Sequence, residues 1–136
     1  MNLKTLRTCL ILFIFVSTTS YSPASHSNDL LRLAKSLCDA AKKDDRGSMR
    51  KKLKSAKMRL RQVYAGINCG STGSLLRVAT KSGSIEAATF IATKIGKKKL
   101  AASEADGKTI IQWTEEMVAA GDASKQAFID LYKSKL

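Results

Sequence analysis

Two widely spaced cysteines are the first residues in the sequence that could do chemistry. Cys38 and Cys69 both follow the apolar N-terminal stretch, whereas the third cysteine lies within it. In an oxidising compartment an even pair of cysteines favours a disulfide bond, and this one would close a loop of about thirty residues. Redox catalysis usually uses the close spacing C-x-x-C, which is absent. We therefore predict a structural disulfide, with two buried free thiols or a redox pair as the alternatives.

A run of positive charge is the second such feature. Eight lysines and arginines occur between residues 46 and 61, with no acid among them. If these residues form one continuous helix, four of the cations fall on a strip about 60° wide. These anion-binding candidates are Arg50, Lys54, Lys57 and Arg61. The strip could bind phosphates of nucleic acid, lipid headgroups or lipopolysaccharide. Alternatively, it could be a solvated face on which the aliphatic parts of the lysine and arginine side chains cover the edge of the core. It lacks interleaved aromatic residues, which argues against stacking on single-stranded nucleic acid.

Few residues have the types and spacing that catalysis or metal binding requires. The single histidine, His26, falls in the expected flexible leader or is removed with the N-terminal signal segment, so neither a histidine-based triad nor a metal site can be built around it. Asp44 and Asp45 fall in an expected turn, and Glu115 and Glu116 are helical neighbours that point about 100° apart. We therefore expect no catalytic residues, no metal, no cofactor and no enzymatic activity.

The N-terminal residues follow the order of a secretory signal peptide. Lys4 and Arg7 precede an apolar stretch at 9–16, and small residues follow it. The stretch is far shorter than the ~20 residues that span a bilayer. We expect a signal peptide at 1–24, a flexible leader at 25–28 and no transmembrane segment after cleavage; cleavage after Ser27 or an uncleaved anchor are the alternatives. The mature protein would be periplasmic or secreted. We do not expect it to bind nucleic acid, because it would leave the cytoplasm.

The remaining chain has the size and composition of one helical domain. About 112 residues follow the signal peptide, enough for a single core. Removal of Lys4 and Arg7 lowers the net charge from +13 to about +11, a balance that favours anionic partners. The chain has one proline, few aromatic residues and many alanines, leucines and lysines, so we expect an all-α fold at 29–136.

Apolar residues at three- and four-residue steps predict about six helices in three antiparallel hairpins, at about 29–64, 74–96 and 108–134. Ser48 is the expected N-cap of a second helix that continues to Tyr64. Gly83 and Gly121 mark the turns inside the second and third hairpins. The buried face of the second helix is expected to hold Met49, Leu53, Ala56, Leu60, Val63 and Tyr64.

The second and third hairpins resemble ankyrin repeats. Residues 74–86, S-L-L-R-V-A-T-K-S-G-S-I-E, are similar to the pattern T-P-L-H-x-A-A-x-x-G-H-x-E, and 106–112, D-G-K-T-I-I-Q, to D-G-x-T-P-L-H. A poorer copy lies at 37–41. The leading apolar positions of the three copies, Leu37, Leu76 and Ile111, are 39 and 35 residues apart, close to the ankyrin period of roughly 33.

The copies depart from the ankyrin pattern at several positions. The expected proline is Leu75 or Ile110, and the expected histidine is Arg77 or Gln112. The first copy lacks the turn glycine, and the third has about three extra residues before it. The resemblance implies stacked hairpins with a concave face for a protein partner, near which Arg77 and Gln112 would lie. An unrelated helical bundle is the alternative.

Two functions therefore follow as expectations. The first is an exported, non-enzymatic interaction module of unknown specific role that binds a protein partner through its helical hairpins. The second is a periplasmic or envelope protein that binds lipopolysaccharide or acidic lipid through the strip of cations. Salt distinguishes the two, because screening weakens polyanion binding far more than it weakens a packed protein interface.

Overall fold

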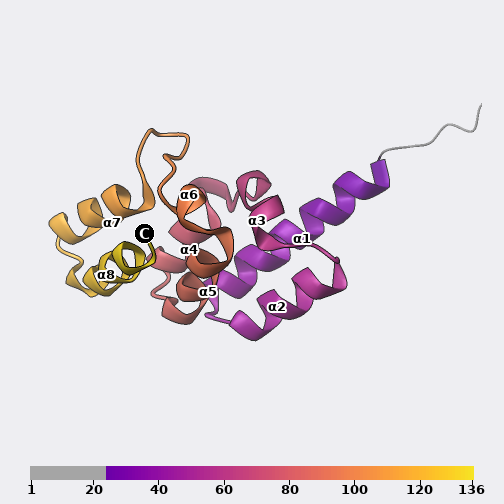
Figure 1. Cartoon of the computed structure of the whole chain (residues 1–136), viewed down its shortest axis with the longest axis horizontal. Coiled ribbons are helices and arrows are strands. Elements are labelled where there is room, and N and C mark those ends of the chain that lie inside the picture. The colour runs from indigo at the N-terminus through magenta and orange to yellow at the C-terminus, as the bar shows by residue number, and fades with distance from the viewer. Residues whose placement is uncertain (1–23) are drawn as a thin grey trace, which may run out of the picture.

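The computed structural model describes residues 24–136, which form eight α-helices and three short 3-10 helices with no strand in that range (Figure 1). The all-α class is confirmed, but the expected number of six helices was too low. The α-helices are α1 (Ala24–Lys42), α2 (Arg46–Ser55), α3 (Leu60–Val63), α4 (Leu75–Lys81), α5 (Ile85–Ile95), α6 (Lys97–Leu100), α7 (Ile110–Ala119) and α8 (Gln126–Lys135). The 3-10 helices are η1 (Tyr64–Gly66), η2 (Gly70–Thr72) and η3 (Ala123–Lys125).

Three pairs of packed helices follow one another along the long axis of the molecule (Figure 1). The pairs are α1 with α2, α4 with α5, and α7 with α8. The first helices of the pairs touch in sequence, α1 against α4 and α4 against α7, and the second helices do the same, α2 against α5 and α5 against α8. The two extra helices, α3 and α6, are single turns in the connections between the pairs. The described chain therefore contains three successive helical pairs, with two additional single-turn helices between them.

The same turn joins the two long helices of every pair. Its central residue adopts a left-handed conformation, with φ of 56° at Asp44, 73° at Gly83 and 109° at Gly121. The next residue donates its N–H to the carbonyl oxygen five positions earlier, which is the Schellman arrangement that ends a helix. These bonds are Asp45 N to Ala40 O at 2.9 Å, Ser84 N to Ala79 O at 2.8 Å and Asp122 N to Met117 O at 3.0 Å. The first pair thus makes this turn with aspartate in place of glycine.

Asp44 also joins the first helical pair to the second. Its Oδ1 accepts a hydrogen bond of 2.7 Å from the backbone N–H of Ala87, in the first turn of α5. The first N–H groups of a helix have no partner within the helix, so the carboxylate caps α5 from the neighbouring pair. The ion pair between Arg46 and Glu86, at 3.5 Å, lies at the same contact.

The second helix is shorter than predicted. It begins at Arg46, with Asp45 and not Ser48 as the N-cap, because the Asp45 carboxylate accepts the Ser48 N–H at 2.8 Å. It ends at Ser55, where Met58 N donates to Leu53 O at 3.0 Å. This fourth Schellman turn places Lys57 in the left-handed region, with φ of 53°. The chain becomes helical again only at α3, so the expected continuous helix to Tyr64 was wrong.

The N-terminal segment differs from the expected leader. Helix α1 begins at Ala24, so the backbone of residues 25–28 is helical where a flexible leader was predicted. The proposed signal peptide falls almost entirely on residues 1–23, which lie outside the described part of the chain. Within the described part, no helix is both long enough and apolar enough to cross a membrane.

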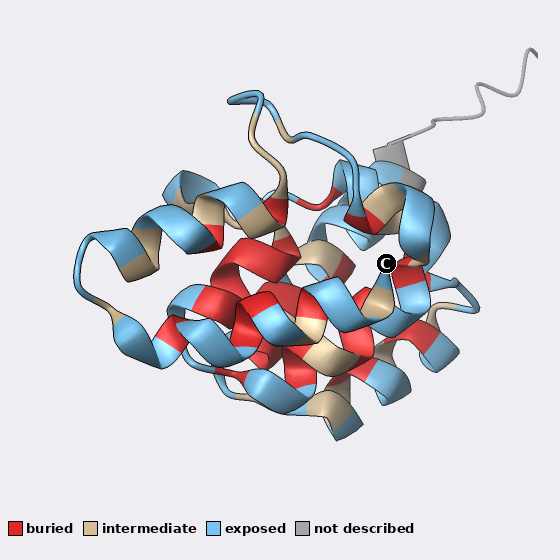
Figure 2. Ribbon diagram, turned by 60° about the vertical axis from the view of Figure 1, so that its left-hand side comes forward, coloured by how far each residue is buried: buried red, intermediate tan, exposed pale blue. Residues whose placement is uncertain are grey.

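The core runs through the centre of the three pairs (Figure 2). The predicted apolar positions Met49, Leu53 and Leu60 are buried even though the helix that carries them is interrupted. Cys38 and Cys69 form the predicted disulfide, with 5.7 Å between their Cα atoms. The bond ties α1 to the connection just before η2, across a sequence separation of 31. The disulfide therefore fixes the long connection between α2 and α4 to the buried face of helix α1.

Candidate functional site

The four predicted anion-binding residues do not form one helical strip. Arg50 and Lys54 lie on α2, Lys57 lies in the turn that ends it, and Arg61 lies on α3. All four side chains are exposed, but the break after Ser55 changes the direction of the chain between the second and fourth cations. Two of them, Arg50 and Arg61, instead reach a common depression in the surface.

This depression, the basic cleft, has a volume of about 630 Å³. Its walls come from α2, from the turn after α2, from α3 and from α5. Its lining residues are Arg50, Leu53, Met58, Arg59, Leu60, Arg61, Gln62, Phe90 and Lys94. Four of the nine are cations and none is an acid, so the basic cleft combines a positive rim with apolar walls.

Specific contacts place the side chains of two of the three arginines of the basic cleft. The Arg50 guanidinium carbon lies 5.9 Å from the centre of the buried Phe90 ring, within cation–π range. The Arg61 guanidinium lies against Gly96, where a Cβ atom would come within 3.2 Å of Nη2. Gly96 therefore leaves the space that Arg61 occupies at the end of α5. The backbone N–H of Arg59 donates to Gln62 Oε1 at 3.2 Å, which fixes the start of α3.

The cations of the basic cleft have no acidic partner within the described part of the chain. The six ion pairs found there are Arg46–Glu86, Arg77–Glu104, Arg77–Asp106, Lys108–Glu116, Lys125–Asp122 and Lys133–Glu115. Residues 46–103 carry 14 cations and a single acid, so this segment accounts for the whole net charge of +13. The excess positive charge therefore lies in the segment from α2 to α6, which contains the basic cleft.

Sequence reasoning missed two of the four cleft cations. On one continuous helix Arg59 would point away from the expected strip, about 180° from Arg50. Lys94 belongs to a different helical pair. The break has no glycine to mark it, since Lys57 takes the left-handed position. Met58 is the one residue whose type could have indicated the break. On a continuous helix this apolar side chain would lie on the polar face, away from the core; in the structure it lies just after the break and keeps 37% of its surface accessible.

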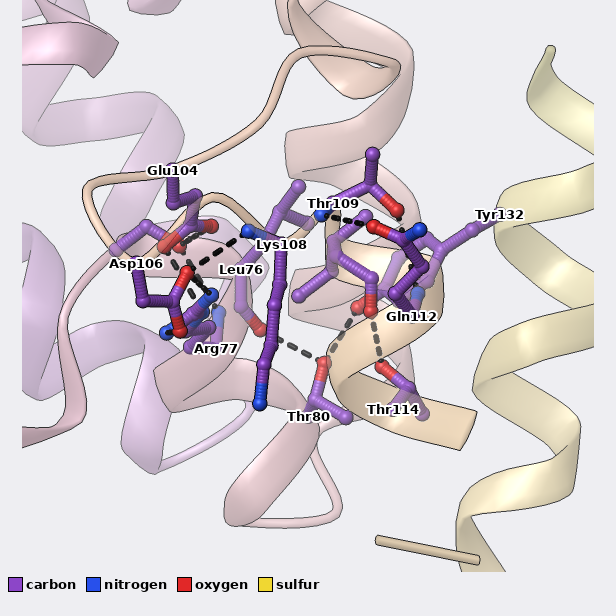
Figure 3. A network of polar contacts seen from close by, with 12 residues as sticks. Leu76, Arg77, Thr80, Glu104, Asp106, Lys108, Thr109, Gln112, Thr114 and Tyr132 are labelled. Carbon is purple, nitrogen blue, oxygen red and sulfur yellow. Dashed lines mark hydrogen bonds and ion pairs between the residues drawn. The ribbon is translucent and has the colours of Figure 1, made fainter. Parts of the chain in front are cut away.

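Arg77 was expected on a protein-binding face, but its side chain is buried in a polar network (Figure 3). Its Nη1 and Nη2 each donate to a carboxylate oxygen of Asp106 at 2.8 Å. Its Nε lies 2.9 Å from Glu104 Oε2, an ion pair without hydrogen-bond alignment, and its guanidinium carbon lies 5.1 Å from the centre of the Trp113 ring. The hydrogen bonds from Arg77 lower the pKa of Asp106 to about 2, and those same bonds raise the pKa of Arg77.

Gln112, the other predicted interaction residue, is exposed at the start of α7. It forms a capping box with Thr109: Thr109 Oγ1 accepts from Gln112 N at 3.2 Å, and Gln112 Oε1 accepts from Thr109 N at 2.9 Å (Figure 3). The structure thus separates the two residues. Arg77 joins α4 to the 101–109 loop and to α7, while Gln112 starts a helix and remains accessible.

A second, more apolar cavity of about 320 Å³ lies between the connections that precede α4 and α7. Tyr64, Ile67, Leu76, Leu100 and Ile110 form most of its apolar lining. Burial raises the pKa of the Tyr64 hydroxyl to about 12, so the group stays neutral at physiological pH. We refer to this space as the loop-side cavity.

The acidic pairs considered for catalysis have structural roles. Glu115 pairs with Lys133 of α8 at 3.1 Å, and Glu116 pairs with Lys108 at 2.6 Å. Asp44 and Asp45 cap α5 and α2. Within residues 24–136, no group of three or more histidine, cysteine or acidic side chains is arranged to hold a metal ion.

These features define a class: an all-α, disulfide-bonded domain with a basic cleft. Residues 37–102 match the model of a protein family described as "Protein of unknown function (DUF3718)". The matched segment contains both bonded cysteines and every lining residue of the basic cleft, and it ends before α7 and α8. No curated protein and no solved structure matches the chain.

Proposed function

We propose that this protein is an exported, non-enzymatic module that binds anionic components of the cell envelope through the basic cleft. One observation carries the proposal: four cations converge on a single concave site, and none has an acidic partner in the described chain. A folded domain gains nothing from such convergence, since like charges repel. A bound anion would relieve that repulsion.

The N-terminal sequence and the disulfide both support export. The order of basic, apolar and small residues in the first 24 positions is typical of a signal peptide. A disulfide between Cys38 and Cys69 is typical of proteins that fold in an oxidising compartment. Lipopolysaccharide and acidic lipid are polyanions that such a protein would meet in an envelope.

A protein-binding role through ankyrin-like stacking is the second candidate. The successive contacts of α1, α4 and α7, and of α2, α5 and α8, favour stacked repeats. The common left-handed turn at Asp44, Gly83 and Gly121 supports the same repeat, with Asp44 in the position of the glycine that the first copy lacks. A partner would then meet the exposed Gln112 and the loop-side cavity, but not the charge of Arg77.

Salt dependence tests the choice between these functions. The mature chain should bind heparin and vesicles that contain phosphatidylglycerol, and its affinity should fall at least about a hundredfold between about 50 and 500 mM salt. Vesicles of phosphatidylcholine alone are the control and should not bind. If the chain ignores both polyanions but captures a protein from its native envelope at high salt, the protein-binding role replaces the anion-binding one.

A further inference from the structure

The basic cleft has apolar walls as well as a positive rim, and this combination points to a particular ligand. Leu53, Leu60 and Phe90 are largely buried and form its inner surface. Met58 lines the same cleft and keeps 37% of its surface accessible. A polyanion held by charge alone would need cations on a surface and no apolar wall.

The turn that ends α2 brings two residues of this apolar wall together. In a Schellman turn the residue after the left-handed position frequently packs against the residue five before it. Here that pair is Met58 and Leu53, joined by the bond from Met58 N to Leu53 O at 3.0 Å. Methionine is unbranched and polarisable, so its exposed part can adapt to a flexible hydrocarbon. The local geometry of this turn therefore places the Leu53 and Met58 part of the wall, and α3 and α5 add Leu60 and Phe90.

The positive rim suits a phosphate group. Arginine presents a planar fork of donors that matches the oxygens of phosphate, and three arginines and one lysine reach the rim. The Arg50 guanidinium lies over the Phe90 ring, and the Arg61 guanidinium lies in the space left by Gly96. Two of the three guanidinium groups are therefore already positioned by the fold. The volume of about 630 Å³ lies within the range of sites for small ligands.

We propose that the basic cleft binds one phosphate-headed amphiphile, with the phosphate on the arginines and the hydrocarbon against Met58, Leu53 and Phe90. This proposal rests on the anion-binding function and names the ligand class for it. A membrane lipid with a phosphate headgroup and a free phosphate share the charged part of this chemistry. They differ in the hydrocarbon, which the lipid alone would place on the apolar wall.

Calorimetric titration with three probes tests the proposal: octyl phosphate below its micelle concentration, inorganic phosphate and octanol. We expect octyl phosphate to bind at one site, at least about tenfold more tightly than inorganic phosphate, because the buried methylene groups add to the charge contacts. Octanol should give no measurable binding. Equal affinities for octyl phosphate and inorganic phosphate would overturn the proposal and leave a simple phosphate site.

Two variants locate the binding. Met58→Ser alters an exposed side chain, so the fold should survive, and it should weaken octyl phosphate about threefold or more while leaving inorganic phosphate unchanged. Arg59→Gln should weaken both phosphates. If octyl phosphate does not bind while heparin still does, the amphiphile proposal is wrong and the anion-binding function stands. If neither heparin nor octyl phosphate binds, the amphiphile proposal and the anion-binding function are both wrong.

Discussion

Asp106 binds Arg77 through both carboxylate oxygens, at 2.8 Å to Nη1 and 2.8 Å to Nη2. The two residues are 29 positions apart and belong to different parts of the fold, α4 and the loop before α7. Their ion pair, together with the contact of Arg77 with Trp113, ties the third helical pair to the second. A residue that the sequence placed on a binding face therefore holds the stack together.

This ion pair predicts a pH dependence of stability. The pKa of Asp106 is lowered from 3.8 to about 2 in the folded chain, so its contribution is present above the unfolded pKa and is lost as pH falls through the folded one. Asp106→Asn should therefore lower Tm above about pH 4.5, and the gap from wild type should close as pH approaches about 2. Thermal melts of both proteins across this range provide the measurement. A gap that does not change with pH would show that the charge of Asp106 does not matter.

The left-handed conformation of Lys57 predicts that a glycine there stabilises the fold. A side chain at φ of 53° is strained, whereas glycine adopts this region freely. Lys57→Gly should raise the free energy of unfolding by about 0.5–1 kcal/mol, measured by urea denaturation. Lys57→Ala is the matched control, because it removes the same charge and keeps the strain. If alanine stabilises the protein as much as glycine, charge repulsion and not backbone strain is the cause.

The disulfide should contribute a large share of the stability. For a loop of this length, the entropy lost by the unfolded chain corresponds to about 3–4 kcal/mol. Replacing Cys38 and Cys69 together by serine should lower Tm by more than about ten degrees in a domain of this size. Reduction of the wild-type protein with dithiothreitol should cause a similar fall. A change of only a degree or two in both experiments would mean that the bond is not a structural crosslink.

The sequence predicted the helical pairs and the disulfide because local signals mark them. Gly83 and Gly121 identify two turns, and the apolar spacing identifies the buried faces. The turn at Asp44 was expected but its left-handed conformation was not, and the turn at Lys57 was not recognised. Neither residue type signals a left-handed conformation as strongly as glycine does. Because the turn at Lys57 was missed, the cations were predicted to lie on one helical strip. In the structure the chain turns there, and α2, α3 and α5 form the walls of the basic cleft. Lys94 could not have been assigned, since the packing of α5 on the first pair is a tertiary contact.

The most direct measurement compares two double variants that each remove two positive charges. Arg59→Gln with Lys94→Gln removes two cations of the basic cleft, and Lys54→Gln with Lys57→Gln removes two exposed cations outside it. Each cation near an anionic surface contributes about 1 kcal/mol, so the cleft variant should bind phosphatidylglycerol vesicles about 30-fold more weakly than wild type. The outside variant should lose no more than about threefold, because Lys54 and Lys57 do not line the cleft and would keep only a screened attraction to the bound lipid. Equal losses in the two variants would contradict a localised site and show that diffuse surface charge does the binding.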